Sequence, residues 1–402
     1  LIGILLFFLN IADSEAGEIL THIKISSTFT PVGSGARAMG MGGAFIAVAD
    51  DATAASWNPG GLIQLETPEV SMAYSFSHWR EDYKSPLHPE SEGMNEKHLD
   101  DLNYFSVALP FQLFKRNFVA SINYQRLYDM YKNLDFGYTY SGYFSNGTPY
   151  YLNLTQHFKQ NGGIKAFAPA IAYQVTPQFS VGITFNIWTD NLGWDNEWTE
   201  ITRVYGQGAI GADHFESSIF IYEKFSNFEG FNLNIGFLWD ITRLITIGGV
   251  FKTPFTAHFR HRYCWYSVEK YPTLNRELSS SYFYKDSMEL KMPASFGFGI
   301  AFRFSDAFTW SLDIYRTQWS RFFRKVNGKE YSDIDNRLRS QSNVDDTTQI
   351  RTGMEYLFIL EKTIIPLRFG LFYDPRPSHK HSHTFWGFSV GSGFMLGNLV
   401  VD

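Results

Sequence analysis

The sequence predicts an all-β fold, a transmembrane antiparallel up-and-down β-barrel that encloses its own N-terminal segment as a hatch. Three observations predict this fold. Stretches of about ten residues alternate between apolar and polar side chains. Short and long connections alternate between these stretches. Residues 33–62 form a Gly- and Ala-rich run that suits neither a strand nor a helix and packs tightly only inside another structure.

The composition excludes several classes of protein. The 402 residues are 18% aromatic and 18% charged, and their mean hydropathy of −0.19 does not fit a helical membrane protein. A net charge of −6 does not indicate a nucleic-acid partner, which would favour an excess of basic residues. Because Cys264 is the only cysteine, no intrachain disulfide framework holds the fold together. We expect no cofactor.

The N-terminus resembles the end of a secretory signal peptide. Residues 1–9 are apolar, and S-E-A at 14–16 has the small-x-small form of a cleavage site. We therefore expect residues 1–16 to be the remnant of a leader, and a buried N-terminal strand is the alternative. No other stretch approaches the roughly 20 apolar residues of a membrane helix. An exported chain of this kind contacts a membrane through strands.

Residues 17–66 are predicted to form the hatch, inside the barrel that the rest of the chain builds. Its glycines admit backbone conformations that a side chain forbids, and they let neighbouring backbone approach closely. Asp50 and Asp51 suit capping or a turn better than calcium binding, because further oxygen ligands in register are missing. The candidate gating residues are Gly35, Arg37, Gly40, Gly42, Gly43, Asp50, Asp51, Trp57, Asn58, Pro59 and Gly60.

Residues 67–402 are predicted to form the barrel wall. Strict alternation over such lengths indicates a strand with two unlike faces. It is cleanest at 179–187, 231–239, 296–304, 308–314 and 365–373. It is weaker at 70–76, 105–111, 118–124, 167–175, 245–251, 350–358 and 386–390. These stretches make twelve strands, and a thirteenth begins near Asn398.

The connections place all short turns at one end of the sheet. Short turns are predicted at 114–117, 176–178, 242–244, 305–307, 361–363 and 396–398. Long links lie at 81–101, 131–163, 190–229, 260–291, 320–348 and 374–382. Outer-membrane barrels have this asymmetry. A soluble β-propeller needs a repeat of roughly 40–50 residues, and the sequence shows none.

The charges indicate which face of the strands meets lipid. The apolar phase of the five cleanest strands carries no charged residue, whereas Asp240, Arg303, Asp313 and Arg368 lie on the opposite phase. A basic side chain facing lipid at the bilayer midplane costs about 2–4 kcal/mol. Twelve or more strands enclose more volume than side chains fill. The apolar phase therefore points outward, and the polar phase lines the lumen.

The strand count also indicates a fragment. Single-chain bacterial barrels have an even number of strands. Strand thirteen begins at the short-turn end and the chain stops at Asp402. We expect the rest of strand thirteen and all of strand fourteen to be missing.

The hatch sequence R-A-M-G-M-G-G-A-F-I-A-V-A-D-D-A-T-A-A-S-W-N-P-G-G-L at 37–62 resembles that of the FadL/TodX family. Further similar stretches are G-F-N-L-N-I-G-F-L-W-D at 230–240, F-K-T-P-F at 251–255, M-P-A-S-F-G-F-G-I-A-F-R-F-S-D at 292–306 and L-D-I-Y-R-T-Q-W-S-R-F at 312–322. The family usually has Asn-Pro-Ala in the hatch, where this chain has Gly60. The short Gly-rich hatch also resembles that of PorV-like proteins, which dock secreted proteins.

The resemblance implies a fold of fourteen strands and a location in the bacterial outer membrane. It implies passive transport of long-chain fatty acids or other hydrophobic molecules, with a hatch that gates release sideways through the wall. The expected partners are the lipid bilayer and a hydrophobic ligand or detergent, and a monomer is expected. A PorV-like protein-docking component is the alternative, and a barrel hydrolase built on His258 or His261 is a third, weaker one.

Three further groups of residues are candidates for binding or passage. Tyr138, Tyr140 and Phe144 could form a landing surface, or simply pack their own loop. Arg303, Arg351 and Arg368 could hold a fatty carboxylate, although inward ion pairs with Asp313 and Glu355 are favoured. Pro169 removes a ladder hydrogen bond and could mark the lateral gap. The alternating His379, His381 and His383 are weak as a metal site, so none is assigned.

Overall fold

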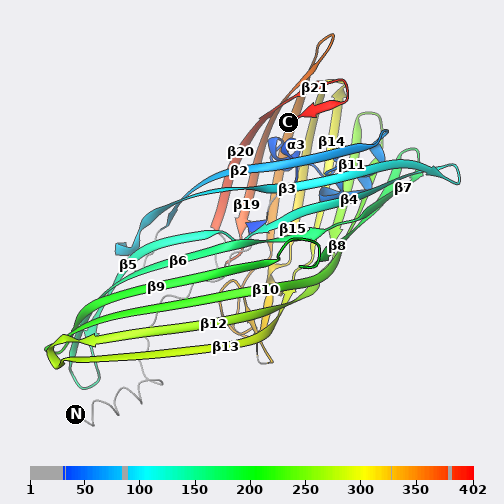
Figure 1. Cartoon of the computed structure of the whole chain (residues 1–402). Helices are drawn as coiled ribbons and strands as arrows, with labels where there is room; N and C mark the ends of the chain where they lie inside the picture. Colours follow the sequence, from blue (N-terminus) through cyan, green and yellow to red (C-terminus); the bar gives the residue numbers. More distant parts are fainter. Residues whose placement is uncertain (1–29, 32, 84–88, 327, 379–382) are drawn as a thin grey trace.

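The computed structural model describes residues 30–31, 33–83, 89–326, 328–378 and 383–402 (Figure 1). The predicted leader, the first part of the predicted hatch at 17–29, and His379 and His381 lie outside these residues. None of the helices in the described part of the chain is long and apolar enough to cross a membrane.

Twelve strands form one antiparallel meander, as the alternation predicts. Eleven ladders join them in chain order. The strands are β2 (Glu69–Tyr83), β3 (Gly93–Leu113), β4 (Arg116–Asp129), β7 (Ala170–Thr176), β8 (Phe179–Trp188), β10 (Asp213–Asp240), β11 (Ile245–Lys252), β14 (Ser295–Ser305), β15 (Phe308–Thr317), β18 (Thr347–Ile359), β19 (Ile364–Arg376) and β20 (His383–Ser392). Within the described residues, the ladders leave β2 and β20 at the two edges of this sheet.

The two faces of the strands differ as predicted. Phe298 and Phe369 point outward and are 49% and 43% exposed, whereas Asp313 and Arg368 point inward and are 1% and 3% exposed. Outward aromatic and aliphatic side chains suit hydrocarbon, and inward polar side chains find partners in the lumen. The predicted apolar lipid face is therefore confirmed.

The long links of the sequence prediction continue as strands over much of their length. They form an outer sheet, in which the outer half of β10 pairs with β9 and β12. Figure 1 shows this sheet extending away from the hatch, toward the lower left. Its other strands are β5 (Lys132–Tyr143), β6 (Pro149–Phe167), β9 (Glu197–Ile210), β12 (Phe255–Tyr271), β13 (Arg276–Met292), β16 (Phe323–Val326) and β17 (Lys329–Ser332).

Short elements complete the described fold. The turns after β3, β7, β10, β14 and β18 are short, as predicted. β21 (Phe394–Leu396) and β22 (Leu399–Val401) form a small hairpin, and β22 lies where the thirteenth strand was predicted to begin. The single-turn 3₁₀ helices are η3 (Pro89–Ser91), η4 (Pro272–Leu274) and η5 (Trp319–Arg321).

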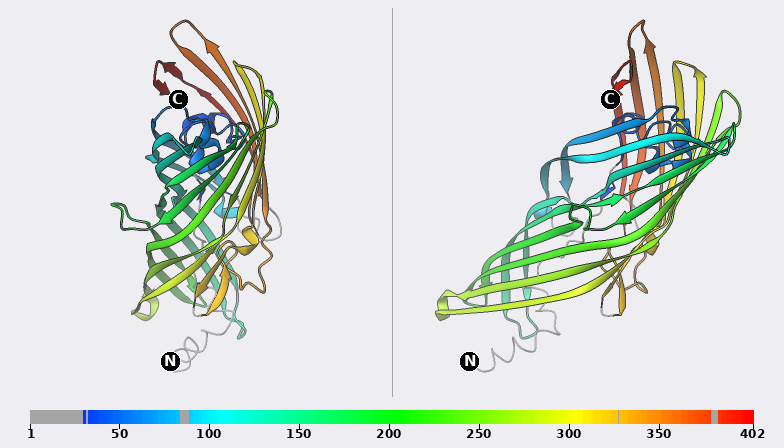
Figure 2. Two further views of the ribbon diagram at one scale, coloured as in Figure 1. Left: turned by 90° about the vertical axis from the view of Figure 1, so that its right-hand side faces the viewer. Right: turned by 45° about the vertical axis from the view of Figure 1, so that its right-hand side comes forward.

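The hatch lies inside the curve of the sheet, near the short turns (Figure 2). It consists of β1 (Thr30–Pro31), α3 (Ala36–Gly40), α4 (Ala54–Trp57) and η2 (Pro59–Gln64). Its small apolar side chains form one buried cluster with inward alanines of the wall, such as Ala108 and Ala172. Small residues on both sides let the hatch backbone approach the strands.

Candidate gating site and apolar interior

Side chains of the wall hold the hatch by bonding to its irregular backbone. A buried carbonyl outside a helix or ladder needs another donor. Wall hydroxyl groups supply several of these donors. Ser389 donates to the Gly40 carbonyl at 2.9 Å, and Tyr104 donates to the Ala52 carbonyl at 2.7 Å. Thr184 donates to the Ala55 carbonyl at 2.7 Å, and Ser180 donates to the Gly60 carbonyl at 2.8 Å.

Two glycine contacts fix how closely the hatch approaches the wall. A Cβ atom on Gly370 of β19 would lie 2.1 Å from the Gly42 nitrogen, and Gly42 itself has a φ of 68°. A Cβ atom on Gly60 would lie 2.8 Å from the Cα atom of Phe237 on β10. Real Cβ atoms do not tolerate such distances, so these positions need glycine for packing as well as for conformation.

Asn58 ties the hatch to itself and to the wall. Its side-chain amide donates to the carbonyl oxygens of Ile46 and Phe237, both at 2.8 Å, and its Oδ1 accepts from Gly60 N at 3.1 Å. Asn58 is fully buried, so each of these bonds replaces a bond to water.

Charged residues form a network between hatch and wall. Arg37 of α3 donates to the two carboxylate oxygens of Glu355 on β18, at 3.0 and 2.8 Å, and also pairs with Asp50. Glu355 accepts a further bond from Arg368 of β19, at 2.6 Å. Arg368 also pairs with Asp402 at 2.6 Å. A partly buried two-point pair of this kind is strongly directional.

The other two lumen arginines predicted to bind a ligand also contact the hatch. Arg351 donates to the Gly42 carbonyl at 2.9 Å, and Arg303 donates to Gln64 of η2 at 3.1 Å. Asp313 accepts from Ile46 N at 2.8 Å. These inward side chains serve hatch and wall contacts in this structure. Of the ion pairs anticipated with Asp313 and Glu355, the described residues form the one between Arg368 and Glu355.

The remaining candidate gating residues lie in the same interface. Trp57 donates from its indole nitrogen to the Ser34 carbonyl at 2.8 Å, and Gly35 N bonds Asn103 of β3 at 3.3 Å. Asp51 accepts from Thr53 N at 2.8 Å, the turn contact expected of it. Desolvation raises the pKa of Asp51 to about 6, against the lowering effect of Arg37 and Thr53. Pro59 is buried against β8, and Gly43 lies beside Arg351.

Outward of the hatch, the interior changes from polar to apolar. Inward asparagines form a polar layer, in which Asn186 bonds Asn234 at 3.0 Å and Trp188 donates to Asn232 at 2.9 Å. Beyond it lies an apolar interior cluster. Its buried members are Met130, Ile164, Ala166, Trp188, Trp198, Phe225, Phe228, Ala257, Phe259, Met288, Leu290, Met292 and Phe322.

The sequence analysis did not predict the apolar interior cluster. Part of the reason is that six of its members lie in stretches interpreted as links, namely Trp198, Phe225, Phe228, Met288, Leu290 and Phe322. Trp198 stacks on Phe225 with ring centroids 4.5 Å apart and contacts Phe259 at 5.5 Å. The sequence does carry a signal for this part of the chain. From 255 to 263, the odd positions are mostly apolar or aromatic and the even positions are polar or basic, which is the alternation of a strand. Aromatic rings and flexible methionines at one place form a surface that suits apolar molecules of varied shape.

The predicted landing aromatics lie far out on β5 and its turn. Tyr138 is buried and donates to Gln156 at 3.2 Å. Tyr140 packs edge-on against Tyr138 at 5.6 Å, and Phe144 packs on Tyr150 at 5.0 Å. These contacts match the alternative that the aromatics pack their own segment.

The wall is continuous at Pro169. Ala168 N donates to Asn123 O at 2.8 Å, and Phe185 N donates to Pro169 O at 2.9 Å. The pairing register on both sides stays constant from Phe167 to Ala170. The structure therefore gives no support to a lateral gap at Pro169.

The ladder does separate elsewhere, between β3 and β4. Its outermost pair is Tyr104 with Gln125, although β3 continues to pair with β2 and β4 continues to pair with β6. On the far side of this split, β1 pairs with the free edge of β4. An ion pair between Asp101 and Arg126 crosses the split. Within the described residues, no ladder joins the two strands beyond that pair.

A wall of antiparallel strands with an apolar outer face, closed inside by a hydrogen-bonded hatch, defines a β-barrel transport protein of the outer membrane. The comparisons with known proteins place the chain within this class. It belongs to the outer membrane protein transport protein family (OMPP1/FadL/TodX), whose family model matches residues 27–386. The predicted family and location are therefore confirmed.

Solved structures of low sequence identity share the fold. The CymD monoaromatic hydrocarbon channel is 15% identical, with a TM-score of 0.51 and coverage of 92% of this chain and 91% of that one. A FadL homologue of Pseudomonas aeruginosa is 12% identical, with a TM-score of 0.50 and coverage of 94% and 88%. No curated protein matches the sequence.

Proposed function

We propose that the protein is a passive channel for hydrophobic small molecules, gated by its hatch. The observation that carries this proposal is the apolar interior cluster, which lies directly outward of the hatch and its polar layer. An apolar solute gains free energy at such a surface, at roughly 25 cal/mol per Å² of apolar area removed from water. The named compounds of the related channels, monoaromatic hydrocarbons, support aromatic molecules as well as fatty acids.

The proposed exit is the split between β3 and β4, in place of Pro169. Leu127 and Tyr128 of β4 pack against the apolar interior cluster, so the cluster reaches the split. A solute moving there meets no continuous ladder of backbone bonds beyond Tyr104 and Gln125. The Asp101–Arg126 pair closes the split in this state. Lateral release delivers an apolar molecule directly to hydrocarbon.

Hatch movement is the proposed gate. Arg37 holds the hatch through Glu355, a carboxylate that it shares with Arg368, and Arg351 holds it through the Gly42 carbonyl. A solute that displaces these contacts frees the hatch. We keep residues 17–66 as the proposed hatch and 67–402 as the proposed wall. The contacts of a single chain complete this gate, which supports a monomer as the working unit.

A reversible crosslink between hatch and wall tests the proposal. Gln64 of η2 and Arg303 of β14 are joined by a side-chain hydrogen bond of 3.1 Å, so cysteines at these two positions lie within reach of a short thiol-reactive crosslinker that contains a cleavable disulfide. In a Cys264→Ser background, crosslinked Q64C/R303C should stop the uptake of labelled toluene and oleate by cells, and a reductant that cleaves the crosslink should restore it. The single variant Q64C, treated with the same reagent, is the control. Wild-type uptake through the crosslinked double variant would refute hatch gating, and the toluene-to-oleate ratio identifies the preferred solute class.

A further inference from the structure

The outward face of the outer sheet can be followed along the ladders from the lipid-facing belt. On β10, Phe231, Ile235 and Trp239 are exposed and point outward. A bulge between Ser226 and Glu229 then shifts the alternation of outward and inward side chains by one residue. Ser226 pairs with Arg260 and Glu229 pairs with His258, and these two partners share one face of β12. Beyond the bulge, the even-numbered residues of β10 therefore point outward.

A row of basic side chains crosses three strands on this outward face. Arg262 of β12 lies directly opposite Lys224 of β10 and Lys285 of β13. Arg260, two residues nearer the membrane on β12, is also exposed. Like charges directly opposite each other on a sheet are destabilising, so this arrangement needs another explanation than stability. It stands out in a chain with a net charge of −6.

Of the row, only Lys224 has an ion pair within the described residues, which leaves Arg260, Arg262 and Lys285. Glu197 pairs with Lys224 at 2.7 Å, and Glu289 pairs with Lys325 at 3.1 Å. Glu229 lies nearer the belt, opposite His258. Lys285 lies over the ring of Phe283, with its Nζ atom 5.5 Å from the ring centroid. In the described part of the chain, no ion pair engages the two central arginines of the row.

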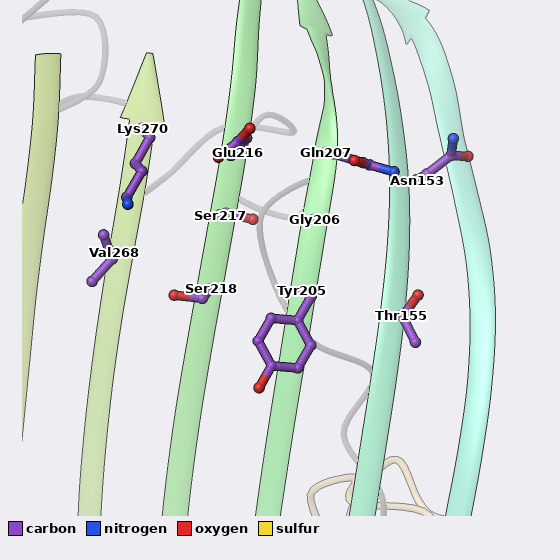
Figure 3. Close-up of a pocket in the computed structure, with 10 residues that line it drawn as sticks. All are labelled: Asn153, Thr155, Tyr205, Gly206, Gln207, Glu216, Ser217, Ser218, Val268 and Lys270. Atoms are coloured by element: carbon purple, nitrogen blue, oxygen red, sulfur yellow. The ribbon is translucent and has the colours of Figure 1, made fainter. Parts of the chain in front are cut away.

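Still farther out on the same face lies a polar groove of about 450 Å³ (Figure 3). It is lined from four neighbouring strands, β6, β9, β10 and β12. Tyr205 of β9 lines it and is half exposed, and Asn153, Gln207, Glu216 and Lys270 line it as well. An exposed aromatic ring among amide, hydroxyl and carboxylate groups suits the faces and hydroxyl groups of sugars.

We propose that this outward face binds a phosphorylated glycolipid of the outer leaflet. Its acyl chains lie on the apolar belt, its phosphates bond Arg260, Arg262 and Lys285 of the row, and its outer sugars occupy the groove. Along β10 and β12, the apolar belt comes first, the basic row follows and the polar groove lies farthest out. A phosphorylated glycolipid has its hydrocarbon, phosphate and sugar in the same order. The arginine fork matches phosphate geometry and makes charge-assisted bonds. The site is separate from the transport route, which runs on the inner face.

The probe for the test is bis-phosphorylated lipid A, presented to the purified full chain in mixed micelles. The triple variant R260Q/R262Q/K285Q should bind it about tenfold more weakly, since three exposed charge contacts of about 0.5 kcal/mol each sum to that factor. The matched control K115Q/R243Q/K362Q removes the same charge at the short turns and should bind as the wild type does. High salt should reduce the difference between the two variants.

Two further binding measurements decide whether the face recognises the sugars and the phosphates of the lipid. The exposed groove variant Y205A/Q207A should weaken binding of a lipopolysaccharide with core sugars several-fold and leave lipid A binding unchanged. Lipid A stripped of its phosphates should bind the wild type as weakly as lipid A binds the triple variant. Equal binding by the triple variant, or undiminished binding of the stripped lipid, would overturn the proposal. Displacement by inorganic phosphate at equal concentration would overturn the lipid assignment and reveal a simple anion site.

Discussion

Arg37 on the hatch and Glu355 on β18 form a two-point ion pair across 318 residues of sequence, with nitrogen–oxygen distances of 3.0 and 2.8 Å. Glu355 also accepts from Arg368, so one buried carboxylate joins two guanidinium groups. Glu355 is therefore the central anion of the contact between hatch and wall, and its charge offsets the buried Arg368 and the partly buried Arg37.

Replacing Glu355 with glutamine should loosen the hatch. The shape is kept, but Arg37 and Arg368 lose their shared counter-ion, and breaking a buried pair costs about 3 kcal/mol. Hydrogen exchange of the hatch amides measures this change as faster exchange of residues 36–64. The control is Arg316→Gln, which removes an exposed pair with Asp346 and should cost about 1 kcal/mol or less. Unchanged hatch protection in E355Q would show that the pair does not hold the hatch.

Asn58→Asp should release the hatch more than its small change in size suggests. The Asn58 amide donates to two carbonyl oxygens at 2.8 Å, and a carboxylate there would face both as an acceptor. Two lost bonds and a buried charge without a partner cost about 3 kcal/mol or more. Proteolysis after Arg37 reports the released hatch. Asn117→Asp is the control, because Asn117 bonds Gln174 at the exposed turn end. Equal resistance of N58D and wild type would contradict the assigned role.

Gly370→Ala tests the close approach of hatch and wall. The added Cβ atom would lie 2.1 Å from Gly42 N, so either the hatch moves or β19 bends. We expect a loss of about 1–3 kcal/mol in thermal unfolding and a higher basal leak. Gly137→Ala on β5 is the control, since its nearest contact would be at an ordinary 3.6 Å. An unchanged melting temperature for G370A would contradict the close contact between Gly370 and Gly42.

The hatch should dock more firmly in mild acid. Asp51 has its pKa raised from 3.8 to about 6 in the folded chain, so the folded state binds this proton more tightly than the unfolded state does. The stabilising contribution is complete below pH 3.8 and is lost as the pH rises through about 6. Hatch protection in the wild type should therefore fall between pH 5 and 7 by up to about 2 kcal/mol. Asp51→Asn should flatten this dependence, and an unchanged profile in D51N would assign it to another group.

The strands of the wall were predictable because lipid and lumen impose opposite demands on alternate residues, as at 179–187 and 365–373. The outer sheet was not, because its outward face carries charge and its inward face carries Trp198 and Phe225, which reverses the polarity of the pattern. For Arg368 the sequence left two roles open, a ligand site and the favoured inward ion pair. An inward arginine has the same periodicity whether it holds a ligand or pairs with Glu355, and only the folded chain brings the two within 2.6 Å.

The location of the exit can be decided by two substitutions that make opposite predictions. Asp101→Asn weakens the ion pair with Arg126 that crosses the split between β3 and β4. Asp101 is partly exposed, so the fold should tolerate the change. If solutes leave there, D101N should speed the uptake of labelled toluene several-fold, because less energy is needed to open the split. Pro169→Ala supplies an N–H group in a ladder that is already continuous on both sides, so uptake should stay at the wild-type rate. Slower uptake by P169A together with unchanged uptake by D101N would return the exit to Pro169. The pair is informative because each variant serves as the folding control for the other.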